Sequence, residues 1–202
     1  MLSPPIVILA GGRGSRIGGG KPQRQLGSQT LLDHVLARAR EYGDDVAIAG
    51  GGDAAPAVRV LDDLVAGQGP ISGLQSALHY AASKGMRHVL IVPCDTPFLP
   101  HDLLTRLTGA IGDEAAALAC SGDRIHPACG LWAVSAADRL HEYVALGRQS
   151  LIGFAELVGY SAVEWPGAPV DPFFNINSAA DLEEAERLLD SLPARDQKSA
   201  AR

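Results

Sequence analysis

The hydrophobic residues in the first part of the chain follow strand and helix patterns in alternation. Ile6–Leu9 is a short aliphatic run after two prolines, which predicts a fully buried strand. Apolar residues within Leu31–Tyr42 recur at three- and four-residue spacing and predict an amphipathic helix. Val46–Ala49 is again strand-like and is followed by glycines that end it, and a further short strand is predicted over Arg59–Leu61.

The same alternation continues to the end of the chain. Leu74–Ala81 has helical spacing, and His88–Val92 is the clearest buried strand, bounded by Pro93. Ser178 begins the last predicted helix as its N-cap, with Asp181 in the place of the usual Glu of a capping box. The elements between them are a helix, two strands and two helices, over residues 101–110, 115–120, 130–134, 135–146 and 150–158.

This order of elements predicts the fold class. Strands that alternate with helices favour a mostly parallel sheet with helices on both faces. The 202 residues contain no internal repeat or convincing linker, and this length fits one compact domain. We therefore expect a three-layer α/β/α, Rossmann-like domain over residues 1–192, followed by a polar C-terminal tail at 193–202.

Composition and charge narrow the class of protein. Apolar residues make up 47% of the chain and charged residues 20%, as in ordinary globular proteins. The net charge is -6 and the cations are dispersed, so the sequence offers no basic block for nucleic acid. Three cysteines without a CxxC pair or metal-ligand spacing indicate a reducing compartment. The first apolar run is too short for a signal peptide or membrane helix, so we expect a cytoplasmic protein that binds neither membrane nor nucleic acid.

A glycine-rich loop follows the first predicted strand. Glycines let the backbone turn sharply and bring N–H groups close to an anionic ligand, and Arg13, Arg16 and Lys21 add cations to the same loop. Pro22 after the lysine excludes a Walker A loop, and a dinucleotide fingerprint would need a further glycine. The loop leaves the edge of the sheet where α/β proteins bind ligands, so it predicts a phosphate-binding site. The alternative is a glycine loop with scattered surface cations.

A carboxylate follows the buried strand His88–Val92. Asp95 lies in a turn flanked by prolines, and Mg²⁺ prefers one or two carboxylates together with phosphate oxygens. If Asp95 faces the glycine loop, the two segments together form a phosphate and metal site. The alternative is that Asp95 only caps the turn or the following helix. Cys94 is expected to be a small buried residue rather than a nucleophile.

Six motifs occur in order along nearly the whole chain. They are LAGGRGSRIGG from Leu9, Lys21 with the following QLGSQTLLDHV, GPISGL from Gly69, PCDTPFLP from Pro93, RIHP from Arg124 and DPFFNIN from Asp171. Together these motifs resemble those of the molybdenum cofactor guanylyltransferases. The first and the fourth are fairly specific in combination, and six motifs in the same order make coincidence improbable.

The resemblance implies an activity and a set of residues. It implies a nucleotidyltransferase fold, Mg²⁺ as cofactor, and transfer of GMP from GTP to the terminal phosphate of molybdopterin with release of pyrophosphate. Other cofactor-assembly proteins are implied as transient partners. Lys21, Arg16 and Asp95 would act in catalysis, and Asp95 would bind the metal ion. The implied nucleotide-binding residues are Leu9, Ala10, Gly11, Gly12, Lys21, Asp62 and Asp95.

The acceptor side is predicted from the last two motifs. Arg124 and His126 offer two potential cations for an anionic pterin phosphate, although His126 is equally well explained as a hydrogen-bonded structural histidine. Asn175 and Asn177 resemble the family's acceptor-side or metal-proximal polar pair. The other histidines are expected on helix faces, helix ends and a strand edge, without partners.

Some positions depart from the family pattern, and other functions stay open. Gly20 stands where the family usually has Asp, and Ala49, Gly50 and Gly51 stand where an Asn is expected at the end of the second strand. Base contacts from that strand would therefore come from backbone groups. The alternatives are a molybdopterin cytidylyltransferase, another small NTP-dependent nucleotidyltransferase, or a non-catalytic nucleotide-binding adaptor. Leu9–Gly12 reads LAGG rather than the LAAG of the cytidylyltransferases, which favours GTP.

Overall fold

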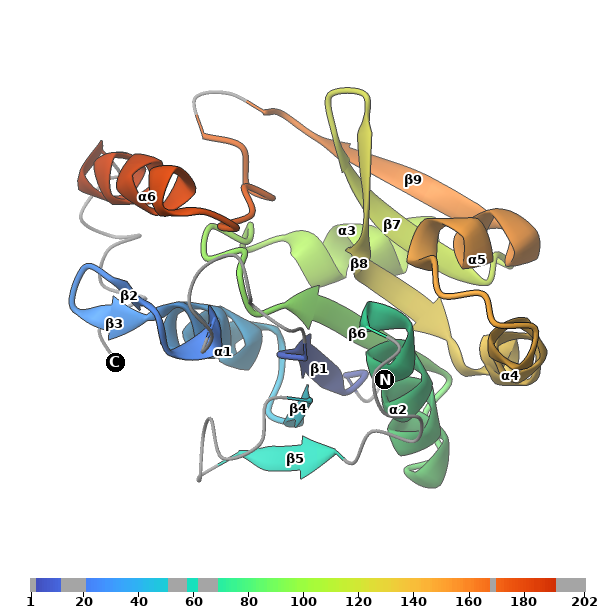
Figure 1. Cartoon of the computed structure of the whole chain (residues 1–202). Coiled ribbons are helices and arrows are strands. Elements are labelled where there is room, and N and C mark those ends of the chain that lie inside the picture. Colours follow the sequence, from blue (N-terminus) through green and yellow to red (C-terminus); the bar gives the residue numbers. More distant parts are fainter. Residues whose placement is uncertain (1–2, 12–20, 51–57, 62–68, 168–169, 192–202) are drawn as a thin grey trace.

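A seven-stranded sheet forms the centre of the molecule (Figure 1). The computed structural model describes residues 3–11, 21–50, 58–61, 69–167 and 170–191, and of Lys21 the backbone only. The strands lie in the order β5-β4-β1-β6-β8-β7-β9. Only the two pairings made by β8 are antiparallel among these strands. The bounds are β1 Ile6–Leu9, β4 Val46–Ala49, β5 Arg59–Leu61, β6 His88–Pro93, β7 Ala116–Ser121, β8 Arg124–Ala133 and β9 Tyr160–Trp165.

Helices cover both faces of this sheet. Helices α1 and α3 pack on one face and α2, α4 and α5 on the other, while α6 lies beside a small hairpin formed by β2 and β3. The helices are α1 Leu31–Tyr42, α2 Pro70–Ser83, α3 Leu103–Ala110, α4 Ala137–Ala145, α5 Leu151–Val158 and α6 Ala179–Ser191. The remaining short elements are the 3₁₀ turns η2 Lys21–Gln23 and η3 Val134–Ala136 and the strands β2 Gln25–Leu26 and β3 Gln29–Thr30.

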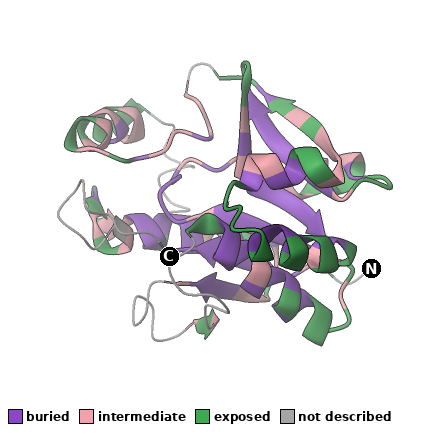
Figure 2. Ribbon diagram, turned by 45° about the vertical axis from the view of Figure 1, so that its right-hand side comes forward, coloured by how far each residue is buried: buried purple, intermediate pink, exposed green. Residues whose placement is uncertain are grey.

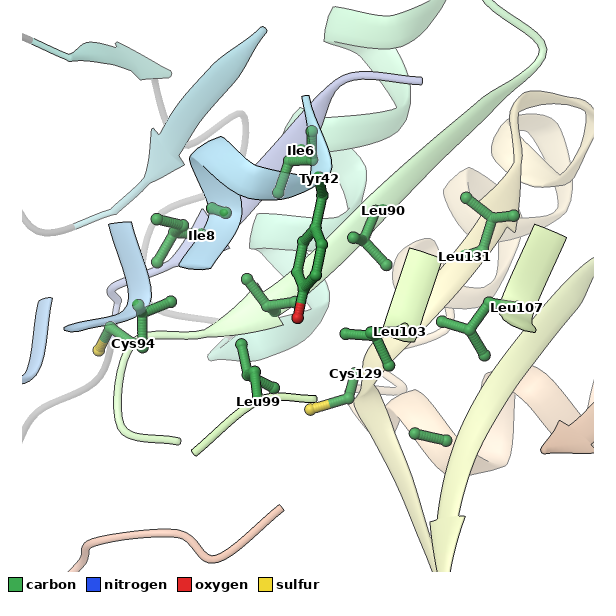
Figure 3. Packing of buried hydrophobic residues seen from close by; sticks show 14 of the residues in the cluster. Ile6, Ile8, Tyr42, Leu90, Cys94, Leu99, Leu103, Leu107, Cys129 and Leu131 are labelled. Carbon is green, nitrogen blue, oxygen red and sulfur yellow. The ribbon is translucent and has the colours of Figure 1, made fainter. Parts of the chain in front are cut away.

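Alternate residues of each central strand enter two different cores. In β1, Ile6 and Ile8 pack with α1 and α3, whereas Val7 and Leu9 pack with α2. Figure 3 shows the first of these cores, and Figure 2 shows the central strands as buried. A strand covered on both faces reads as a continuous apolar run, which is why β1 and β6 are evident in the sequence. The predicted three-layer, mostly parallel fold is confirmed.

Several predicted elements agree closely with the structure. The helix over Leu31–Tyr42 and the strands at Val46–Ala49 and Arg59–Leu61 have the expected bounds. The capping box is also present, because Asp181 Oδ2 accepts hydrogen bonds from the N–H groups of Asn177 and Ser178, both at 2.8 Å. In return the Asp181 N–H donates to Ser178 Oγ. The predicted tail at 193–202 lies outside the described residues.

Other elements differ from the prediction. Strand β8 begins at Arg124 rather than Gly130, and neither β9 nor the β2–β3 hairpin was expected. The first half of β8 contains Pro127 and is interrupted by a bulge, since Leu118 of β7 faces Gly130 and Ala119 faces His126. A proline and a register shift both break the alternation by which a strand is recognised. Among the helices that the structure describes, none combines the length and apolar character that crossing a membrane requires.

Candidate active site

The loops after β1 and β6 begin side by side at the carboxyl edge of the sheet. Leu9 and Pro93 are register partners in the parallel pair, and the Cys94 N–H donates to the Leu9 carbonyl at 3.1 Å. Asp95 follows directly and is 7% exposed, while Gly11 at the start of the glycine loop is exposed. The structure therefore brings Leu9, the beginning of the glycine loop and Asp95 together, as the sequence predicts.

The end of β4 fixes the start of the glycine loop through backbone packing. The Ala10 N–H donates to the Ala49 carbonyl at 2.9 Å. Gly50 has a φ of 73°, and a Cβ added to it would lie 2.7 Å from both Cα and N of Gly11. No side chain fits there without displacing Gly11, which accounts for the glycine at position 50.

Helix α2 directs its N-terminus to the same edge. It connects the parallel strands β5 and β6, so it must run back across the sheet from the carboxyl edge. A Cβ on Gly73 would lie 2.7 Å from Leu9 Cδ2, which shows how closely the first turns of α2 approach the end of β1. The unpaired N–H groups and the dipole at a helix N-terminus favour anions. The edge thus has a second feature suited to phosphate.

The segment before α6 crosses this edge beside Asp95. The Ile176 N–H donates to the Asp95 carbonyl at 3.0 Å, so Asn175 and Asn177 flank the point of contact. Ile176 itself is fully buried in a small core with Leu26 and Leu31. Asn175 Oδ1 is buried and has no hydrogen-bond partner in the part of the chain that the structure describes. A buried amide oxygen of this kind is available for a ligand.

Arg124 and His126 lie on the β7–β8 hairpin, at the end of β8 that is nearest the same carboxyl edge. Arg124 is exposed, whereas His126 is buried, with its Nε2 2.8 Å from Ser121 Oγ and its ring stacked on Phe173 at 4.8 Å. Burial lowers the pKa of His126, and Arg124 lowers it further, while Asp171 opposes the shift. The ring is therefore neutral at pH 7, and of these two side chains only that of Arg124 is positively charged.

Comparison with known proteins decides the family. The family model described as the MobA-like NTP transferase domain matches residues 6–158. The chain belongs to this family. It is 40% identical over 195 residues to the molybdenum cofactor guanylyltransferase of Bradyrhizobium sp. (strain ORS 278), a match that covers 91% of this chain and 92% of the relative.

Solved structures show the same fold for this NTP transferase. Molybdopterin-guanine dinucleotide biosynthesis protein A of Archaeoglobus fulgidus superposes with a TM-score of 0.73 at 23% identity, covering 93% of this chain and all of that protein (100%). The 2-C-methyl-D-erythritol 4-phosphate cytidylyltransferase of Thermus thermophilus gives a TM-score of 0.66 at 20% identity, covering 94% and 100%. Nucleotidyltransferases for different bases therefore share this architecture.

The residues at this edge suit a magnesium ion, which needs few protein ligands, better than a metal ion held entirely by protein side chains. The described ranges contain no group of three or more His, Cys, Asp or Glu side chains that would hold a metal. Mg²⁺ needs only one or two protein carboxylates when phosphate oxygens and water complete its octahedron. Asp95, with the Asn175 amide oxygen in the adjoining segment, meets this lower requirement.

The thiols near the site are not suited to nucleophilic chemistry. Cys94 and Cys129 are both buried, as expected for Cys94 from the sequence. Burial raises the pKa of the Cys129 thiol, and the negative charges of Asp95 and Asp171 raise it further. Because the thiolate is the reactive form, Cys129 stays protonated and unreactive at neutral pH.

Some predicted residues are not placed by the structure, and others were missed. Gly12, Arg16 and Asp62 lie outside the described residues, as does the side chain of Lys21, so their roles stay predictions. The expectation that the other histidines lack partners is wrong in two cases. His34 Nε2 lies 3.0 Å from the Leu26 carbonyl, and His101 Nδ1 lies 2.8 Å from Glu41 Oε2.

Sequence reasoning also missed three residues that shape the site, namely Gly50, Ser121 and Phe173. The glycines after β4 predict the end of a strand and backbone contacts to the base, but they do not indicate the close approach of Gly50 to Gly11. The Ser-Gly-Asp-Arg stretch at 121–124 is a turn signal that would have placed Ser121 opposite the start of β8. Phe173 belongs to the DPFFNIN motif, but the sequence does not indicate its contacts, because its partners come from β8 and β9.

Proposed function

We propose that the chain transfers GMP from GTP to the terminal phosphate of molybdopterin, forming the guanine dinucleotide cofactor and releasing pyrophosphate. Family membership and the 40% identical guanylyltransferase support this activity. The observation that carries the proposal for the site is the hydrogen bond from Cys94 to Leu9, because it joins the glycine loop and the Asp95 loop at one edge. A triphosphate on the first loop then lies within reach of the carboxylate on the second.

The reaction needs positioning more than proton transfer. An oxygen of the acceptor phosphate forms a bond to the α-phosphorus, the bond from that phosphorus to the bridging oxygen breaks, and its electron pair leaves with pyrophosphate. The attacking oxygen is already ionised at neutral pH, so no strong general base is required. Two anions must instead be brought together and the charge of the leaving group stabilised.

The nucleotide occupies the carboxyl edge between the first loop and α2 in this proposal. Leu9, Ala10, Gly11 and Gly12 contact GTP, and since the Ala10 N–H is bonded to Ala49, Ala10 contacts it through other atoms. Arg16 and Lys21 place positive charge on the triphosphate and on the leaving pyrophosphate. Asp62 holds the nucleoside.

Asp95 and Asn175 are the proposed holders of Mg²⁺. When bound there, the ion would supply positive charge to the phosphate oxygens. Asp95 would hold the ion, and its own backbone is kept in place by the Ile176 N–H on its carbonyl. Arg124 and Asn177, both exposed, are proposed to bind the acceptor phosphate, and the family resemblance implies the same contact for His126.

The cellular compartment of the enzyme and its partner proteins are also part of the proposal. Cys94, Cys120 and Cys129 are free thiols, which suits a reducing compartment such as the cytoplasm. Transient contact with other cofactor-assembly proteins stays a prediction from the family resemblance.

The decisive experiment measures pyrophosphate release with each of the four NTPs, with molybdopterin as acceptor and with Mg²⁺ varied. We expect turnover with GTP, dependence on both the acceptor and Mg²⁺, and much slower turnover with CTP. Equal rates with GTP and CTP would remove the guanine assignment and favour the cytidylyltransferase alternative. GTP binding without any pyrophosphate release would favour the adaptor.

Two substitutions test the assignment of catalytic residues. Asp95→Ala is expected to abolish most turnover, and Lys21→Ala to lower kcat by roughly 10²–10³-fold, the scale of removing one charge-stabilising donor. Arg187→Ala in α6 is a matched control, because it removes an exposed cation whose partner is Glu184 in the same helix. A Lys21→Ala variant with wild-type turnover would refute the role of that lysine.

A further inference from the structure

The segment that carries Asn175 is held at two places. At one end the Ile176 N–H bonds to the Asp95 carbonyl. At the other end Phe173, 2% exposed, packs between two aromatic rings, stacked on His126 and edge-on to Trp165 at 5.4 Å. Asp171 closes the turn that leads into Phe173, since its Oδ1 accepts from the Phe173 N–H at 2.9 Å. The position of Asn175 therefore depends on where Phe173 sits.

His126 is itself fixed by the hairpin on which it lies. Its Nε2 shares a hydrogen bond with Ser121 Oγ at 2.8 Å, across the turn that Gly122 makes with a φ of 54°. A buried imidazole with one nitrogen paired loses the freedom to rotate about its own side-chain bonds. The face that it presents to Phe173 is thus set by β7 and β8 rather than by the segment that it supports.

We propose that His126 is a positioning residue for nucleotidyl transfer: its ring, oriented by Ser121, holds Phe173 in place and so keeps Asn175 beside Asp95. The inference rests on the proposed function and extends it, because it assigns His126 a role through Phe173 rather than through contact with the acceptor.

The first test compares His126→Ala with a variant that keeps an aromatic ring. His126→Ala removes the ring that supports Phe173, and a displacement of the order of 1 Å at a reacting group costs about 10²-fold, so we expect kcat to fall by roughly 10–10²-fold. The KM for GTP should change little. The double variant Ser121→Ala/His126→Phe keeps a ring on Phe173 and leaves no unpaired hydroxyl, so it should recover part of the lost kcat, and the remaining loss measures the orientation that Ser121 gives to the ring.

A second readout does not depend on activity. Amide hydrogen exchange over residues 171–177 should be faster in His126→Ala, because the Ile176 N–H loses the support of the packed Phe173. Leu140→Ala is the control for general destabilisation, since Leu140 is fully buried in the core on the other side of the sheet. It should lower stability without changing kcat below its unfolding temperature or the exchange of 171–177.

A double-mutant cycle shows whether His126 acts through Asn175. If it does, His126→Ala should lower kcat much less in an Asn175→Ala background than in the wild type. An equal loss in both backgrounds would overturn the inference, as would unchanged exchange at 171–177. A rise confined to the KM for molybdopterin would also overturn it and would assign His126 to the acceptor. A wild-type protein that transfers no GMP would instead remove the proposed function, while the exchange result would still report on the positioning.

Discussion

At the scale of single residues, Gly50 shows how a residue without a side chain supports the candidate site. Its left-handed φ of 73° costs any other residue about 1–2 kcal/mol, and a Cβ there would collide with Gly11. We expect Gly50→Ala to lower the free energy of unfolding and to raise the KM for GTP, because the collision moves the first residues of the glycine loop. Urea unfolding and GTP titration measure the two effects.

A matched control separates backbone strain from the collision. Gly147 has a φ of 75°, but a Cβ on it would meet nothing within 4 Å. Gly147→Ala should therefore lose stability through the φ angle alone and leave the KM for GTP unchanged. If both variants bind GTP as the wild type does, the contact between Gly50 and Gly11 has no role in the nucleotide site.

Residue positions were predictable where they follow from strand ends. Leu9 and Asp95 each lie at or just after the end of a buried strand, and parallel neighbouring strands bring such ends together. The partners of His34, His101 and His126 were not predictable in this way. Each lies on a different element. The turn signal at 121–124 indicates Ser121 as a neighbour of His126, but no local pattern in the sequence brings His34 to Leu26 or His101 to Glu41.

At the scale of elements, the start of α6 links a helix cap to the candidate site. Asp181 holds the N–H groups of Asn177 and Ser178, immediately after the segment that contacts Asp95. Asp181→Ala should cost about 0.5–2 kcal/mol of unfolding free energy, the usual value of an N-terminal cap, and should speed hydrogen exchange at Asn177. Unfolding in urea, with exchange of the 175–178 amides, tests this expectation.

The same helix offers the control. Glu184 pairs with Arg187 on the exposed surface, where such ion pairs contribute little. Glu184→Ala removes one carboxylate from α6, as Asp181→Ala does, but should change stability by less than about 0.5 kcal/mol. Equal stability of the two variants would mean that the capping box does not anchor the segment.

The elements that the sequence did not predict are strands that pair outside the part of the chain where strands and helices alternate regularly. Strand β9 has an exposure pattern with one fully buried residue, Trp165, because it forms an edge of the sheet. The first half of β8 contains Pro127 and a bulge next to the candidate site. Bulges often lie beside active sites because they turn a side chain to a new direction, and His126 occupies such a position.

At the scale of the whole molecule, the carboxyl edge and the amino edge of the sheet have separate roles. The candidate site lies at the carboxyl edge, whereas Asp45 at the amino edge joins β4 to the end of α2. Its carboxylate accepts hydrogen bonds from Tyr80 at 2.6 Å and Lys84 at 2.8 Å. A change at this edge should therefore alter stability without altering the chemistry at the other.

Asp45→Asn tests this separation through its pH dependence. Burial alone would raise the pKa of Asp45, but hydrogen bonds from Lys84 and Tyr80 and the charges of Lys84 and Arg59 outweigh burial and lower it from 3.8. A carboxylate with a lowered folded-state pKa stabilises the fold above its unfolded-state value and loses this contribution as the pH falls through the folded-state value. Wild type should thus be more stable than Asp45→Asn at pH 7, and the difference should shrink below about pH 4.

Urea midpoints of both proteins at pH 7 and pH 3 measure this difference. Asp44→Asn is the matched control, because it removes the same charge from the exposed neighbouring position and should unfold like the wild type at both pH values. Turnover with GTP at pH 7 and a temperature well below unfolding should be the same in all three proteins. A loss of turnover in Asp45→Asn alone would show that the amino edge transmits strain across the sheet, because packed interiors respond to such changes as a unit.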